Sequence, residues 1–220
     1  MPHDRGFQAF LFDMDGTILS SIAAAERIWS AWAIRHGLEP RTFLPTIHGV
    51  RAVDTIAALG LPGVDPEREA EAITQAEVDD VEGIEPLPGA VEFIASLPPD
   101  RWAIVTSAPR RLALRRISAA GLPRPAILIA AEDVEDGKPA PDGFLLAAAR
   151  LGVSCEDCLI FEDSPAGVAA AEAAGAHVVV VAPGHAFRPQ YPTIDGYRRL
   201  RVDMAGRPEA PLTISFAPLG

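Results

Sequence analysis

Short apolar runs that alternate with alanine-rich segments are the feature of this chain that most limits its fold. The apolar runs lie at residues 9–12, 102–105, 126–129, 159–161 and 178–181. Helical patterns fill the later intervals, at residues 90–96, 110–120, 143–151 and 166–174. Strands that alternate with helices form parallel sheets covered on both faces, so the sequence predicts an α/β, Rossmann-like core.

The interval between the first two runs is far too long for one crossover helix. It holds three helical patterns, at residues 22–36, 50–59 and 66–81. We therefore expect an all-helical cap domain at residues 18–85, inserted into a discontinuous core made of residues 1–17 and 86–220. Ligands of open α/β sheets bind at the carboxyl ends of the strands, and the cap is expected to cover that edge.

The composition and charge of the chain limit the kinds of molecule that we expect it to bind. The chain has 220 residues, is 49% hydrophobic and carries a formal net charge of −11. An acidic protein is repelled by nucleic acid and by anionic membrane surfaces, so neither is an expected partner. No signal-peptide pattern and no apolar stretch of bilayer length is present, and we expect a cytoplasmic monomer or weak oligomer that acts on a small phosphorylated metabolite.

Two segments carry no expected chemistry. Residues 199–202 and 212–216 predict a terminal β-hairpin around a turn at residues 203–206. Cys155 and Cys158 form a Cys-x-x-Cys pair without a second ligand pair or a thioredoxin-like context, so we interpret them as incidental reduced thiols.

Asp13 and Asp15 come directly after the first apolar run and before Gly16. In a strand, residues two apart point to the same side, which would aim both carboxylates into one space. A surface turn after a strand explains a single Asp but gives no reason to place two like charges together. We therefore favour a nucleophile and its acid/base partner.

The lysine content of the chain singles out one further residue. The basic residues are 18 arginines and one lysine, Lys138, which lies in the segment 136–142 among glycine and prolines. A compact ammonium can sit between a carboxylate and a phosphoryl group as a point charge, whereas the planar guanidinium of Arg is a wider fork. The alternative is a lysine retained by chance.

Polar residues end two other predicted strands. Thr106 and Ser107 follow the second run and suit a non-bridging phosphate oxygen, although hydroxyl residues end many strands. Glu162 and Asp163 follow the fourth run and place another carboxylate pair near the first. Carboxylates crowded at one sheet edge beside a phosphate fit Mg²⁺, while a helix N-cap at residue 163 or 164 is the structural alternative.

Together, the segments 10–17, 104–107, 136–142 and 161–167 resemble the four motifs of the haloacid dehalogenase superfamily. The resemblance implies an aspartyl-phosphate on Asp13, acid/base catalysis by Asp15, and a phosphoryl group held by Thr106 and Lys138. It also implies Mg²⁺ bound by Asp13, the Asp15 carbonyl and Asp163, with Glu162 in support. The segments 15–21, 48–51 with Asp54, 101–107 and 161–167 are most similar to sugar and polyol phosphatases of the 2-deoxyglucose-6-phosphate and glycerol-3-phosphate type.

Alternatives within the same resemblance remain open. A mutase similar to beta-phosphoglucomutase shares the core motifs but has a Gly-Val-Ser-Arg cap element, whereas this chain has Arg51 one position earlier. A non-catalytic protein that binds a phosphorylated ligand is the non-enzymatic alternative, although such a protein is expected to have lost one of these residues. We expect His48 and Arg51 of the cap to contact the substrate, with a solvent-facing helix start as the alternative.

Overall fold

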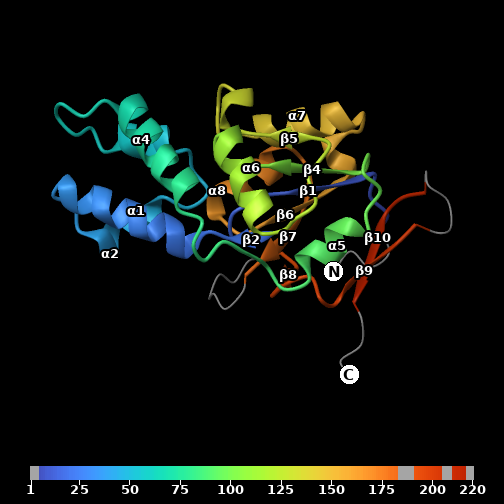
Figure 1. The fold of residues 1–220 in the computed structure, drawn as a ribbon. Helices are drawn as coiled ribbons and strands as arrows, with labels where there is room; N and C mark the ends of the chain where they lie inside the picture. The colour runs from blue at the N-terminus through green and yellow to red at the C-terminus, as the bar shows by residue number, and fades with distance from the viewer. Residues whose placement is uncertain (1–4, 183–190, 205–209, 217–220) are drawn as a thin grey trace.

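The computed structural model describes residues 5–182, 191–204 and 210–216. Within them, the core is a parallel sheet of six strands in the order β5-β4-β1-β6-β7-β8 (Figure 1). The strands are β1 (Ala9–Phe12), β4 (Trp102–Val105), β5 (Leu128–Ile129), β6 (Cys158–Glu162), β7 (His177–Val181) and β8 (Thr193–Ile194). The α/β core is confirmed, and the edge strand β8 was not predicted.

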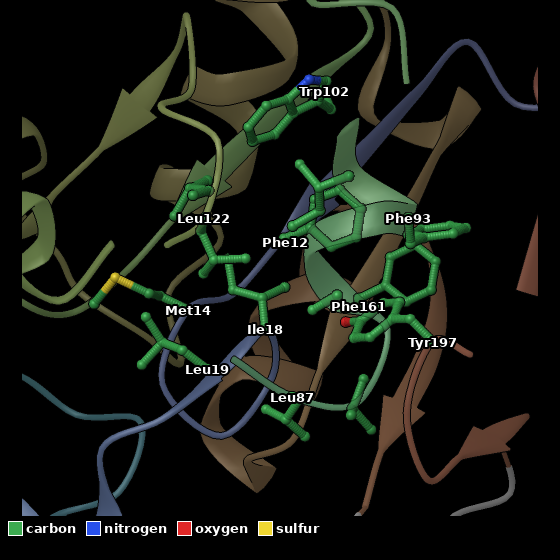
Figure 2. Packing of buried hydrophobic residues seen from close by; sticks show 14 of the residues in the cluster. Phe12, Met14, Ile18, Leu19, Leu87, Phe93, Trp102, Leu122, Phe161 and Tyr197 are labelled. Carbon is green, nitrogen blue, oxygen red and sulfur yellow. The ribbon is translucent and has the colours of Figure 1, made fainter. Parts of the chain in front are cut away.

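Helices cover both faces of this sheet because its buried strands are apolar on both sides. On one face lie α5 (Ala90–Ala95) and α6 (Arg110–Ala119), packed with Phe10 and Phe12 of β1. On the other lie α7 (Asp142–Leu151) and α8 (Pro165–Ala173), packed with Leu11. Because successive side chains of a strand point to opposite faces, Phe10 and Phe12 belong to one apolar cluster and Leu11 belongs to the other. Figure 2 shows Phe12 stacked near Phe161 in the first cluster.

The long interval forms an all-helical unit, which we call the cap. It contains α1 (Ile22–Arg35), α2 (Pro40–Phe43), α3 (Ala52–Ala58) and α4 (Pro66–Asp79), and α2 and the 3₁₀ turn Leu44–Thr46 after it were not predicted. The cap has its own apolar cluster around Trp29, Trp32 and Phe43. Figure 1 shows the cap helices at one end of the sheet, with α4 beside α6.

Both connections between the cap and the core meet in a short antiparallel ribbon. It pairs β2 (Leu19–Ser20) with β3 (Glu85–Pro86). These residues lie at the limits expected for the cap, 18 and 85, although the domain boundaries themselves stay a prediction. A paired ribbon at the base of an inserted unit limits its movement relative to the core to a few backbone positions.

The predicted terminal hairpin is present as β9 (Leu200–Asp203) and β10 (Thr213–Phe216), paired antiparallel. Residues 205 and 206 of its expected turn lie outside the described residues. The segment before it contributes Tyr197, which is buried in the core and donates a hydrogen bond from its hydroxyl to the Thr17 carbonyl at 3.0 Å (Figure 2). Across the described part of the chain, no helix has both the length and the apolar character needed to cross a bilayer.

Candidate active site

The carboxyl end of β1 lies between the ends of β4 and β6, because β1 pairs with both. This topology brings Asp13, Thr106 and Asp163 to one place, as expected for neighbouring parallel strands. They line a pocket of about 100 Å³ that the cap covers. Its lining includes Asp15 and Ser107 from the core and His48 from the cap.

Lys138 lies at the centre of the buried charges. Its Nζ donates hydrogen bonds to Asp13 Oδ1 at 2.5 Å, to Glu162 Oε1 at 2.7 Å and to the Val105 carbonyl at 3.3 Å. Burial alone would lower the pKa of Lys138, but the carboxylates of Asp13 and Glu162 outweigh it and raise that pKa. The side chain is therefore a fixed ammonium beside Asp13.

The Glu162 carboxylate is fully buried and has partners on both oxygens. Besides Lys138 at Oε1, its Oε2 accepts hydrogen bonds from the Asp163 and Ser164 amides at 2.7 and 2.8 Å and from the Ser164 hydroxyl at 3.1 Å. A Cβ at Gly167 would lie 1.6 Å from Glu162 Oε1, so glycine is needed for this packing. Glu162 thus supports the turn after β6 and the position of Lys138.

Ser164 is the N-cap of α8, where its hydroxyl accepts a hydrogen bond from the Gly167 amide at 3.0 Å. The helix cap anticipated at this turn is therefore real, and it is formed by residue 164. It leaves the neighbouring Asp163 side chain in the pocket. Ser164 therefore caps α8, while the adjacent Asp163 lines the pocket.

Asp13, Glu162 and Asp163 each offer a carboxylate oxygen within 4.8 Å of the others. Burial, together with the charge of Glu162, raises the pKa of Asp13 to about 7 against the opposing effect of Lys138. Burial and the charge of Asp13 raise the pKa of Asp163 well above its usual value. When all are ionised, three carboxylates face one ammonium, which leaves this cluster with an excess of negative charge.

Gly16 permits the close approach of the first motif to Asp163. Its φ is +85°, a conformation that favours glycine, and a Cβ there would lie 2.0 Å from Asp163 Oδ2. Any larger residue at this position would push the Asp163 carboxylate away from Asp13. The close approach of the Asp163 carboxylate therefore explains why the first motif has a glycine at position 16.

The Asp15 side chain lies outside the three-carboxylate group. Its Oδ1 accepts hydrogen bonds from the Ser21 hydroxyl at 2.6 Å and from Arg116 Nη1 at 2.9 Å. Arg116 is a site residue that the sequence analysis missed. One feature of the sequence could have identified it. Arg116 shares the buried face of α6 with Leu112, Ala113 and Ile117, and an amphipathic helix normally carries apolar residues on that face.

The end of β4 contacts both the turn after it and the cap. The Thr106 hydroxyl accepts a hydrogen bond from the Ala108 amide at 3.0 Å. The Ser107 hydroxyl donates to the Gly49 carbonyl of the cap at 2.9 Å. The cap loop that carries His48 and Arg51 is thus attached directly to the core beside the pocket.

Arg51 and His48 are placed differently with respect to the pocket. Arg51 donates to both carboxylate oxygens of Asp54, with Nε at 2.6 Å, and to the Glu135 carbonyl at 2.8 Å. It lies beside Gly137 in the Lys138 loop rather than among the residues that line the pocket. His48 does line that pocket. Substrate contact by either residue stays a prediction.

A comparison with known protein families identifies the family that has this arrangement of residues at the strand ends. The model of the haloacid dehalogenase-like hydrolases matches residues 7–175. The chain belongs to this family. The match spans every site residue described above, from Asp13 to Gly167, and includes the whole cap.

Several curated relatives of this hydrolase are named as phosphatases. Hexitol phosphatase A of Escherichia coli (strain K12) is 43% identical over 181 residues, covering 79% of this chain and 82% of that protein. Glycerol-1-phosphate phosphohydrolase 2 of Saccharomyces cerevisiae is 31% identical over 185 residues, covering 79% and 74%. A crystal structure of beta-phosphoglucomutase from Clostridium difficile has a TM-score of 0.77 at 21% identity, covering 89% and 93%, which shows a shared fold.

The cap side of the hydrolase pocket is lined by Trp29, Thr74 and Glu77. Glu77 lies on α4, is buried, and forms an ion pair with Arg116 Nη2 at 3.1 Å. Burial raises the pKa of Glu77, and the nearby Arg116 charge opposes this rise. A buried carboxylate from the cap therefore faces the core across the pocket.

Cys155 and Cys158 are free, buried cysteines. They lie at the start of β6, at the opposite end of the strand from Glu162. Neither cysteine lines the pocket. Their interpretation as incidental reduced thiols stays a prediction.

Proposed function

We propose that this protein is a Mg²⁺-dependent phosphomonoester hydrolase that releases phosphate from a small sugar or polyol phosphate through an aspartyl-phosphate on Asp13. The observation that carries the proposal is the buried contact of Lys138 Nζ with Asp13 Oδ1, at the carboxyl end of β1 and under the cap. A carboxylate fixed by an ammonium in a covered pocket suits nucleophilic attack on a phosphoryl group. Membership in the hydrolase family supports the same reaction class.

The donor set at the strand ends fits Mg²⁺. Asp13 and Asp163 supply hard carboxylate oxygens close together, and burial, with the neighbouring carboxylates, raises the pKa of both groups. We propose that these two residues and the Asp15 carbonyl hold the ion, and that Glu162 acts through Lys138 and the turn amides because both its oxygens are occupied. The bound ion would neutralise charge between the Asp13 carboxylate and the phosphoryl group.

In the first half-reaction, a carboxylate oxygen of Asp13 attacks phosphorus while the bond to the leaving oxygen breaks. Lys138 and the Thr106 end of β4 hold the phosphoryl oxygens during this transfer, because Lys138 contacts Asp13 directly and Thr106 lines the pocket with Asp13. Asp15 gives its proton to the leaving alkoxide, which departs as the free sugar or polyol.

In the second half-reaction, Asp15 takes a proton from a water molecule. The resulting hydroxide attacks the phosphorus of the aspartyl-phosphate, the bond to Asp13 breaks, and inorganic phosphate leaves. Covering the pocket with the cap keeps bulk water out while Asp15 positions the one water that reacts. The same residue thus serves as acid and then as base.

A small, uncharged, polyhydroxylated leaving group fits the rest of the pocket. Its volume of about 100 Å³ and the nearby Thr74 hydroxyl and Glu77 carboxylate suit a short chain or ring with hydroxyl groups. The Glu77 charge would repel a leaving group that carries its own carboxylate. The names of the relatives, hexitol phosphatase A and glycerol-1-phosphate phosphohydrolase 2, support the same class of substrate.

The proposal is tested by measuring phosphate release from a panel of substrates with and without Mg²⁺. The panel contains hexitol, glycerol and 2-deoxyglucose phosphates, with phosphoglycolate and a nucleoside monophosphate for comparison. We expect Mg²⁺-dependent release from the polyol and sugar phosphates, and loss of release in Asp13→Asn but not in Asp100→Asn, an exposed carboxylate of the core.

Three outcomes contradict the proposal in different ways. Conversion of a sugar 1-phosphate to its 6-phosphate without net phosphate release indicates a mutase. Tight binding of a panel member without any turnover indicates the non-catalytic alternative. Retained turnover in Asp13→Asn would refute the assigned nucleophile while leaving a hydrolase of another mechanism.

A further inference from the structure

Three arginines of α6 connect the core to helix α4 of the cap. Arg111 pairs with Glu71 at 2.7 Å and donates to the Gln75 side chain at 3.0 Å. Arg115 donates to the Val78 carbonyl at 3.3 Å. Both are exposed, whereas Arg116 is only 5% exposed. The three form one seam, and only its buried member reaches the candidate active site.

Arg116 joins a carboxylate of the core to a carboxylate of the cap. Its Nη1 donates to Asp15 Oδ1 at 2.9 Å, while its Nη2 lies 3.1 Å from Glu77 Oε1. The guanidinium is a rigid planar fork, so holding one branch fixes the direction of the other. The orientation of Asp15 is therefore linked mechanically to the position of α4.

The two contacts of Arg116 are unequal. The contact with Asp15 is an aligned hydrogen bond, whereas Nη2, like Nε, is buried without an aligned hydrogen bond in the described residues. The Glu77 contact is thus one of charge and proximity. Because Glu77 belongs to α4 of the cap, this ion pair requires the cap to lie against the core.

The hydrogen bonds to the Asp15 side chain all go to one oxygen. Arg116 and Ser21 both donate to Oδ1. Within the described residues this leaves Oδ2 as the oxygen available for proton transfer. Both donors approach from beside the cap, since Ser21 directly precedes α1 and Arg116 contacts Glu77.

From this geometry we infer that Arg116 is a positioning residue for Asp15, and that Glu77 completes the arrangement only when the cap is closed. The inference rests on the proposed function and adds a means by which closure prepares proton transfer. In the open state Arg116 loses its second anchor, and Asp15 loses its alignment with the leaving oxygen. Misplacement by about 1 Å can cost roughly 100-fold in rate, so alignment of this kind is sufficient to gate the chemistry.

The experiment compares leaving groups that do and do not need a proton. We measure KM and the single-turnover rate of leaving-group release, which reports the first half-reaction alone, for Arg116→Met and Glu77→Gln. The substrates are a polyol phosphate and p-nitrophenyl phosphate, whose leaving group departs without protonation. Loss of general acid catalysis costs about 100-fold or more. We expect a loss of that order in this rate for Arg116→Met on the polyol phosphate, a smaller loss for Glu77→Gln, and a loss of less than about 10-fold for both on the aryl phosphate.

Arg111→Met is the matched control because it removes a cap contact of the same seam without touching Asp15. It is expected to leave the single-turnover rate on both substrates near the wild-type value. A second test introduces Arg116→Met into the Asp15→Asn protein. If Arg116 acts through Asp15, the double variant is no slower than Asp15→Asn alone.

The failures of the two proposals are distinguishable. Equal losses on both substrates, or an additional loss in the double variant, would overturn the positioning role while the hydrolase assignment stands. A wild-type protein that releases phosphate from neither substrate would overturn the proposed function and the inference together. If Arg116→Met does not fold, as judged by circular dichroism, the same substrate comparison with Arg116→Lys, which keeps the charge but not the planar fork, decides.

Discussion

Lys138 Nζ lies 2.5 Å from Asp13 Oδ1, and these residues are 125 positions apart in the chain. The contact joins the loop before α7 to the end of β1 and is buried on all sides. The one lysine of the chain thus occupies the place where a compact ammonium can contact two carboxylates and a carbonyl together. Charge alone does not explain the use of lysine here, because every other basic residue in the chain is arginine.

The first prediction concerns the shape of this cation. Lys138→Arg keeps the charge, but a planar guanidinium does not fit the space between Asp13 and Glu162. We expect Lys138→Arg to lose phosphate release almost as completely as Lys138→Ala, by about 100-fold or more, as for removal of one buried electrostatic donor. The control is Arg150→Lys at an exposed position of α7. Near wild-type activity in Lys138→Arg would place the lysine outside the chemistry.

The sequence predicted the strand-end residues because each is identified by a local pattern. An apolar run followed by Asp13 or by Glu162 needs no knowledge of distant contacts, and the parallel topology then brings the ends together. Two-residue β8 has no such pattern, since it forms only where it pairs with β7. Apolar runs therefore identified the other five strands of the sheet, including the two-residue edge strand β5 within the run 126–129, and missed β8, which has no such run.

Arg116 shows a second limit of the sequence. Its partners, Asp15 and Glu77, lie far from it along the chain, and no short motif contains them together. In an arginine-rich segment such as 110–116, charged residues usually form a solvated helix face. The buried charge becomes recognisable only when α4 and α6 are placed side by side, as Figure 1 shows.

The second prediction concerns Asp163 and metal-dependent stability. The folded-state pKa of Asp163 lies above its ordinary value of 3.8, so its ionisation is less favourable in the folded protein than in the unfolded chain. The stability contribution is therefore full below about pH 4 and falls as pH rises toward the folded-state pKa. Without metal at pH 8, Asp163→Asn should be at least as resistant to thermal unfolding as the wild type.

Added Mg²⁺ should reverse this order. A ligand that binds only the folded state stabilises it by about 2.7 kcal/mol at 100 times its Kd. We expect a higher Tm for the wild type in Mg²⁺ than in EDTA, and a much smaller rise for Asp163→Asn. Asp100→Asn should respond to Mg²⁺ like the wild type. An equal Mg²⁺ response in Asp163→Asn would remove Asp163 from the proposed metal ligands.

The third prediction separates backbone strain from steric conflict. Gly16 and Gly37 have similar positive φ angles, +85° and +73°, but only Gly16 has a neighbour where a Cβ would lie. Gly37→Ala should cost about 1–2 kcal/mol of stability through backbone conformation alone. Gly16→Ala should cost more and should also abolish activity, because it displaces the Asp163 carboxylate. Equal stability losses, with activity retained in Gly16→Ala, would contradict the close approach.

The fourth prediction distinguishes the two cap residues. His48 lines the pocket, whereas Arg51 binds Asp54 and the Glu135 carbonyl beside the Lys138 loop. A residue that contacts the leaving group discriminates among substrates, but a residue that fastens the cap affects all of them alike. We therefore expect His48→Ala to change the ranking of sugar and polyol phosphates by KM. Arg51→Ala should raise KM for every substrate by a similar factor.

The control for this comparison is Arg68→Ala, an exposed residue of α4 that lies outside the pocket that Asp13 lines. It should leave both KM and the substrate ranking unchanged. Metal-dependent stabilisation should be the same in all three variants, because the proposed metal ligands lie on the core. A ranking that changes with Arg51→Ala but not with His48→Ala would exchange the two roles. Unchanged kinetics in both would place the substrate contacts elsewhere on the cap, where Trp29, Thr74 and Glu77 line the same pocket.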